Sequence, residues 1–267
     1  MMRLGGKARM VRLIAGSVLL IALAGCNTQA QQAQVMDPID RVQKQDWTYP
    51  PDPSVPYRST PQQRPDLVVA VLPFKDARPV TNSSATAFLW LIPLMPYGWV
   101  SYERPETARV FSSIPAYRLQ LEEDLAKAAT VSFEESQLFR RVYFTLGGET
   151  READLVLRGT ARHTTYNGKT ITYGLSVIGS LLWFIGLPAG TSTNLLDITL
   201  SLTDRDDREL WSYSFSRGDT IAQSWLYNWK NDALQFASLF QTAMNEALQN
   251  LAPELPRIGD AVQSRGR

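Results

Sequence analysis

The segment DLVVAVLPF at residues 66–74 predicts where the folded domain begins. It is a continuous run of aliphatic, mostly β-branched residues that Pro73 ends, which is typical of a strand buried on both faces. The following segments keep clear hydrophobic periods. They predict a helix over 115–139, strands over 140–146, 153–166, 194–202 and 209–217, and a last helix over 231–251.

The resulting β-α-β-β-β-β-α order predicts an α+β domain over residues 67–252. A single mixed sheet of about five strands, with both helices on one face, would bury every apolar stripe. The predicted core stripes are Leu121, Leu125, Ala128 and Ala129 on the first helix, and Ala233, Phe236, Phe240, Ala243 and Ala247 on the last. We expect residues 253–267, which follow the last helix, to form a disordered tail.

The first strand and the polar turn after it, VVAVLPFKDARP at 68–79, resemble the opening strand of TolB N-terminal-like domains. That group includes the lipoprotein of the curli secretion channel and lipoprotein activators of penicillin-binding proteins. The resemblance extends over roughly residues 67–252 through the order of elements. It implies an envelope protein and transfers no binding residue.

The N-terminus has the charge pattern of an export signal. Four basic residues and no acidic residue occur in 1–12, and a short apolar run follows. Leu23-Ala24-Gly25-Cys26 then resembles the lipobox of bacterial lipoproteins, in which the cysteine is lipidated and becomes the first residue. The resemblance implies a signal peptide at 1–25 and a lipid anchor at Cys26, the sole cysteine. Asn27 at the next position favours the outer membrane over retention in the inner membrane.

Residues 26–66 are rich in Gln, Pro and Asp and predict a tether between the lipidated cysteine and the domain. The alternative is an arm that packs along the domain. Because four of the 27 basic residues lie in the signal peptide, the rest of the chain has an excess of acidic residues. Nucleic acid is therefore not an expected partner.

Two apolar segments, 86–102 and 171–190, do not fit a plain sheet-and-helix domain. Internal Gly and Pro residues argue against spanning helices, and the lack of alternation argues against membrane hairpins. Two interpretations remain: an exposed surface that a partner, sister subunits or the membrane interface buries, or two inserts that fold onto each other and complete the core. The first predicts these contact residues: Trp90, Leu94, Tyr97, Trp99, Trp183, Phe184 and Leu187.

Catalytic chemistry has little support. The sole histidine, His163, lies near a strand end, and GLSVIG at 174–179 has one residue too many for a G-x-S-x-G motif. DRDDRE at 204–209 is typical of a charged hairpin turn rather than a calcium loop. We expect no catalytic residues, metal or cofactor.

The sequence therefore predicts an outer-membrane lipoprotein whose domain faces the periplasm. It would act as a non-enzymatic protein-binding or assembly factor, with an envelope protein or sister subunits as partners. The alternative is a subunit of an oligomeric secretion or export pore, and a weaker third hypothesis is an envelope hydrolase.

Overall fold

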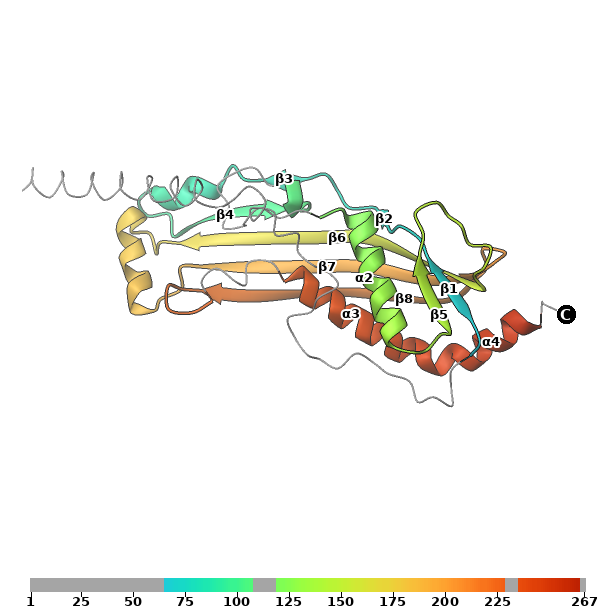
Figure 1. Ribbon diagram of the computed structural model, residues 1–267. Helices are drawn as coiled ribbons and strands as arrows, with labels where there is room; N and C mark the ends of the chain where they lie inside the picture. Colours follow the sequence, from blue (N-terminus) through green and yellow to red (C-terminus); the bar gives the residue numbers. More distant parts are fainter. Residues whose placement is uncertain (1–64, 108–118, 229–234, 265–267) are drawn as a thin grey trace, which may run out of the picture. The chain divides into compact units, whose positions relative to one another are not determined.

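The structure is a computed structural model that describes residues 65–107, 119–228 and 235–264 (Figure 1). The predicted signal peptide, Cys26 and nearly all of the tether lie outside the described residues. The described part is mixed α+β, with an eight-stranded sheet and three α-helices in place of the predicted five and two. The strands are β1 (Val68–Val71), β2 (Lys75–Asp76), β3 (Asn82–Ser83), β4 (Tyr97–Tyr102), β5 (Arg141–Phe144), β6 (Leu155–Ile171), β7 (Gly190–Asp204) and β8 (Glu209–Gln223).

The long strand β6 organises the sheet. Along one edge it pairs in turn with β1 and β2, both parallel, and then with β4, which is antiparallel. Along the other edge it pairs antiparallel with β7, and β7 pairs antiparallel with β8. β5 lies outside β1 and is parallel to it. The sheet is therefore mixed, as predicted, and elongated along the β6–β7–β8 ribbon (Figure 1).

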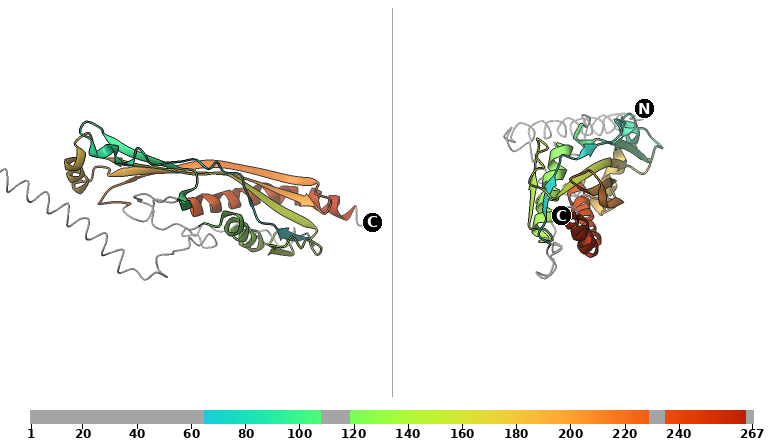
Figure 2. Two further views of the ribbon diagram at one scale, coloured as in Figure 1. Left: turned by 90° about the horizontal axis from the view of Figure 1, so that it is seen from above. Right: turned by 90° about the vertical axis from the view of Figure 1, so that its right-hand side faces the viewer.

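The helical layer covers one end of this ribbon. The helices α2 (Leu121–Glu135) and α3 (Phe236–Leu251) lie on the same face of the sheet (Figure 2). The predicted core stripes are buried in both helices, apart from Ala233, which lies outside the described residues. Opposite them, β7 alternates as predicted and buries these four side chains: Leu196, Ile198, Leu200 and Leu202.

Polar contacts join α3 to β8. Tyr213 donates a hydrogen bond to Glu246 at 2.9 Å, and Trp211 donates one to Asn250 at 2.9 Å. Burial and then the hydrogen bond to Glu246 raise the pKa of Tyr213 to about 12. These two hydrogen bonds hold the edge strand β8 and the helix α3 in a fixed position relative to each other.

Two predictions about elements are wrong. The segment 86–102 is not only an insert, because β4 within it pairs with β6 across six residues. The expected disordered tail at 253–267 instead holds the turn η5 (Ala252–Glu254) and the helix α4 (Leu255–Gln263), and Leu255 and Ile258 are buried. Pro253 does not end helical structure here, because proline is well suited to the first turn of a new helix.

Candidate functional site: an apolar tip

The two apolar segments meet at the end of the sheet that the helices leave uncovered (Figure 1). The first forms the 3₁₀-helix η2 (Ala87–Leu91) and a loop into β4, and the second forms the 3₁₀-helix η4 (Ser176–Ile185) between β6 and β7. Leu94 N–H donates to the Gly174 carbonyl at 2.8 Å, and Thr172 N–H donates to the Pro96 carbonyl at 2.9 Å. The two segments therefore fold onto each other.

A third segment, the turn after β8, joins them. The ring centroids of Trp225 and Phe184 are 4.3 Å apart, and the hydroxyl of Ser224 donates to the Trp183 carbonyl at 3.3 Å. We call the exposed apolar side chains of these three segments the apolar tip. Its members are Phe88, Leu91, Ile92, Leu94, Tyr97, Trp99, Tyr173, Leu175, Val177, Ile178, Leu181, Phe184, Ile185, Leu187, Trp225, Leu226 and Tyr227.

Close backbone approaches hold η2 and η4 against the strands. A Cβ atom at Gly98 would overlap the carbonyl oxygen of Ala87, and one at Gly179 would overlap that of Thr172. Both close approaches are therefore possible only because glycine has no side chain. The indole N–H of Trp183 also donates to the Ile171 carbonyl at 2.8 Å and ties η4 to the end of β6.

The loop between η2 and β4 contains a strained residue. Leu94 has φ of 71° and is 89% exposed. An L-residue with a side chain adopts this left-handed conformation at an energetic cost, and leucine has no polar group to offset it. An exposed apolar side chain held in a costly backbone conformation is a reason to look for function at this loop.

The seven residues predicted as contacts divide into two groups. Five of them, Leu94, Tyr97, Trp99, Phe184 and Leu187, are exposed and belong to the apolar tip. Trp90 and Trp183 are half-buried beneath it and line a cavity of about 130 Å³. These two tryptophans support the tip from below, and a direct contact role for any of the seven stays a prediction.

Sequence reasoning missed the turn after β8 and the outward side of η4. The run SWLYNW at 224–229 carries a signal that could have revealed the turn, because it has three aromatic residues among six and no charged residue. In η4, Val177, Ile178, Leu181 and Ile185 are exposed. Their spacing gives no hint of which side of the helix meets solvent, because nearly every residue of η4 is apolar.

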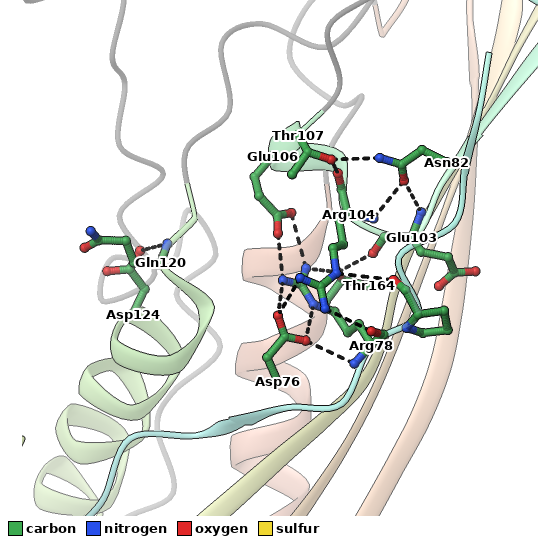
Figure 3. Close-up of polar contacts among 11 residues, drawn as sticks. Asp76, Arg78, Asn82, Glu103, Arg104, Glu106, Thr107, Gln120, Asp124 and Thr164 are labelled. Carbon is green, nitrogen blue, oxygen red and sulfur yellow. Dashed lines mark hydrogen bonds and ion pairs between the residues drawn. The ribbon is translucent and has the colours of Figure 1, made fainter.

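A second cluster of functional groups is polar and gathers around Arg78 (Figure 3). The guanidinium of Arg78, on the segment that follows β2, is 3.0 Å from Asp76 and 2.6 Å from Glu106 of the 3₁₀-helix η3 (Pro105–Thr107). It also donates to the hydroxyl of Thr164 on β6 at 2.6 Å. The side chain of Arg78 is almost completely buried, and both carboxylates are largely buried.

The charges in this cluster compensate one another. Burial alone would raise the pKa of Asp76, but the hydrogen bonds from Arg78 and the charges of Arg78 and Arg104 lower it below its usual value. Burial by itself would lower the pKa of Arg78. The hydrogen bonds to Asp76 and Glu106 outweigh the effect of burial, so the pKa of Arg78 is raised. The cluster is a satisfied ion-pair network that joins β2, η3 and β6.

His163 also has a charged neighbour. Its Nδ1 lies 3.1 Å from a carboxylate oxygen of Glu103, which also accepts a hydrogen bond from Thr165 at 2.9 Å. Within the described ranges, no group of three His, Cys, Asp or Glu residues is placed to hold a metal ion. In the same ranges, no helix has the length and apolar character needed to cross a membrane.

The chain matches no protein-family model, and no curated protein is similar to it. Several solved structures resemble it distantly. A Xanthomonas campestris protein described under the family name DUF330 has a TM-score of 0.37 at 15% identity, over 78% of this chain and 95% of that one. The PelC dodecamer from Paraburkholderia phytofirmans has a TM-score of 0.36 at 12% identity, over 70% and 88%.

A homolog of the neuraminyllactose-binding hemagglutinin from Helicobacter pylori has a TM-score of 0.35 at 12% identity, over 82% of this chain and 97% of that one. All three likenesses are too distant to carry an argument about function. The resemblances to lipoproteins and to TolB N-terminal-like domains therefore stay predictions, and the function has to be argued from the apolar tip.

Proposed function

We propose that this chain is an envelope lipoprotein, anchored by lipid on Cys26, that acts as a non-enzymatic binding or assembly factor. The exposed apolar tip is the observation that carries the proposal. It gathers side chains from three separate segments at one end of the sheet, and the helical layer lies at the other end. Large contiguous apolar patches on folded domains usually mark surfaces that another molecule covers.

The order within the tip supports a contact role. Hydrogen bonds between the two inserts, together with the close approaches at Gly98 and Gly179, fix the exposed side chains before any contact forms. A preformed surface loses less conformational entropy on binding than a surface that must first become ordered. Burying apolar area then favours association by about 25 cal/mol per Å², from which the entropy lost on association has to be subtracted.

The anchor is tested by mass spectrometry of the membrane-extracted chain. We expect the mature N-terminus to be Cys26 with acyl chains attached, and Cys26→Ala to abolish both the cleavage and the lipid. Retention of residues 1–25 in the wild-type chain, or a mature chain without acyl chains, would remove the anchor from the proposal.

The contact role is tested by light scattering on a chain that begins at Asn27, with and without mild detergent. We expect the wild-type chain to need detergent or to form a defined assembly. The double variant Leu181→Asn, Phe184→Ser should be a monomer in buffer alone. The matched control is Ser212→Asn, Ser214→Asn on the polar, exposed positions of β8, which should behave as wild type. A wild-type chain that has the same mass as the double variant, both with and without detergent, would contradict the proposal.

A further inference from the structure

We infer that the apolar tip docks into the interfacial layer of a phospholipid bilayer, which gives the domain a membrane contact of its own. The inference rests on the proposed function, because both assign the working contact to the same tip. It goes further by naming the occupant as lipid rather than another protein. Four features of the tip carry it.

The first feature is shape. The most exposed members come from all three segments: Leu94 is 89% exposed, Ile185 and Ile178 on η4 are 73% and 70% exposed, and Leu226 is 68% exposed. None of these four side chains lines the cavity, which is lined by the half-buried Trp90 and Trp183 and by residues of the strand ends. A protein partner would have to supply a matching recess for each projecting side chain. A fluid acyl layer accommodates such a surface without shape matching.

The second feature is composition. The segments 86–102, 170–196 and 220–229 contain no charged residue. Most of the exposed side chains of the tip are Leu, Ile or Val. The residues that contribute most of the binding energy at protein–protein interfaces are instead most often Trp, Tyr or Arg. Aliphatic side chains without charge are what the acyl boundary of a bilayer accepts.

The third feature is the order of residue types along the strands. Beyond the strand ends the exposed side chains are mainly aliphatic. At the strand ends Tyr97 pairs with Ile171, and two residues further back Trp99 pairs with Lys169. The ammonium of Lys169 lies 5.3 Å from the ring centroid of Tyr97. Two residues of strand span about 7 Å, so aliphatic, aromatic and cationic groups succeed one another as they do at membrane interfaces.

The fourth feature is that the polar groups of the tip are bonded within it. Leu94 and Thr172 donate their backbone N–H groups across the two inserts. The hydroxyl of Ser176 donates to the Leu91 carbonyl at 2.5 Å, and that of Ser180 to the Val177 carbonyl at 2.7 Å. Polar groups without partners would resist transfer into an apolar layer. η4 has ten residues, so the tip reaches the interface and does not span the bilayer.

The experiment uses the full lipidated chain reconstituted in vesicles of phosphatidylethanolamine and phosphatidylglycerol. Cys26 is the only native cysteine, so after its acylation one introduced cysteine is the only free thiol. Ile178→Cys places an environment-sensitive fluorophore on the tip, and Ile185→Cys is a second site in case the first disturbs η4. Glu149→Cys, in the exposed loop between β5 and β6, is the matched control.

We expect both tip labels to be quenched by nitroxide lipids and shielded from aqueous iodide, while the label at 149 shows the reverse. Dilution with lipid should leave this result unchanged, because docking to lipid needs only one copy. Leu181→Asn with Leu226→Asn should lower the docking constant at least about tenfold, as expected when two exposed apolar side chains are removed.

Two results would overturn the inference. Tip labels that stay open to iodide on vesicles would exclude docking. Tip labels that are shielded only at high protein density, without nitroxide quenching, would show that another copy covers the tip; this excludes lipid but leaves the proposed function intact. The proposed function itself fails separately, if the chain from Asn27 and its double variant Leu181→Asn, Phe184→Ser have the same mass both with and without detergent.

Discussion

The helix-covered end of the sheet and the apolar tip are built from the same kinds of residues. At the covered end, Leu196, Ile198 and Phe240 are buried between β7 and α3. At the tip, Ile178, Phe184 and Ile185 are equally apolar but more than half exposed. Both ends have fixed backbone hydrogen bonds, so the difference is the missing second layer. The tip is thus an ordered apolar layer with no second layer packed against it. Its exposed side chains stabilise the fold little until another molecule covers them.

The sharpest test of this difference compares one phenylalanine from each end. Phe240→Ala should lower the free energy of unfolding by about 3–5 kcal/mol, because it leaves a cavity beside Phe74. Phe184→Ala should cost no more than about 1.5 kcal/mol, which is the contribution of its ring contact with Trp225. Urea unfolding of the two variants measures both values. Equal losses would mean that the tip is a second core and not an open surface.

The ion-pair network between the two ends comes next. Arg78→Met should cost about 3–5 kcal/mol at pH 7, because it leaves the carboxylates of Asp76 and Glu106 largely buried without their partner. Arg158→Met is the control, since its ion pair with Asp207 is exposed, and it should change stability by less than about 1 kcal/mol.

The same network predicts a pH dependence with a definite sign. The pKa of Asp76 is lowered in the folded chain, so its contribution to stability is fully present above 3.8 and is lost as the pH falls through the lowered value. The deficit of Arg78→Met should therefore shrink in acid, where Asp76 becomes protonated and no longer needs a cationic partner. Unfolding curves at pH 7 and at a pH well below 3.8 measure this, and a deficit that grows in acid would contradict the assignment.

The covered end could be predicted from the sequence in more detail than the tip. Its apolar residues follow the periods of a helix or a strand, and the partner that buries each stripe lies in the same chain. The helix α4 could not be predicted because a proline directly after a helix, here Pro253, is typical of a helix end and also of the first turn of a new helix. The strand β4 was missed because its apolar neighbours and the prolines at 93 and 96 hide any alternation.

At the tip, composition revealed the segments but not their orientation. In η4 almost every residue is apolar, so no period distinguishes the half-buried Trp183 from the exposed Phe184. The contacts of Trp225 with Phe184 depend on where β8 ends relative to β6 and β7. That register is a property of the whole sheet, and local patterns do not contain it.

A smaller effect is expected when η4 is lifted from the sheet. Gly179→Ala places a Cβ against the Thr172 carbonyl and should cost about 1–3 kcal/mol. Gly147→Ala is the matched control, because nothing lies near its Cβ position and its φ is not positive. Hydrogen exchange should show faster exchange in η4 alone, with β7 and α3 protected as in wild type. Loss of protection throughout the sheet would show that the tip and the covered end unfold as one unit.

The smallest expected effect is a gain in the free energy of unfolding, whereas the other substitutions lower it. It distinguishes a residue that serves contact from a residue that supports the fold. Leu94→Asn removes an exposed apolar side chain and replaces it with a residue that tolerates positive φ. It should raise the free energy of unfolding by up to about 1 kcal/mol and weaken contact through the tip. Ile92→Asn is the control: this residue is half exposed in the same loop, and its φ of −83° is not in the left-handed region.

We therefore expect Ile92→Asn to weaken contact through the tip without any gain in stability. A gain for Leu94→Asn alone, with lost contact in both variants, would mean that the loop gives up stability to present an apolar side chain. If Leu94→Asn instead lowers the unfolding free energy as much as a core substitution does, Leu94 supports the fold. The comparison between an open tip and a covered core would then fail at its most exposed residue.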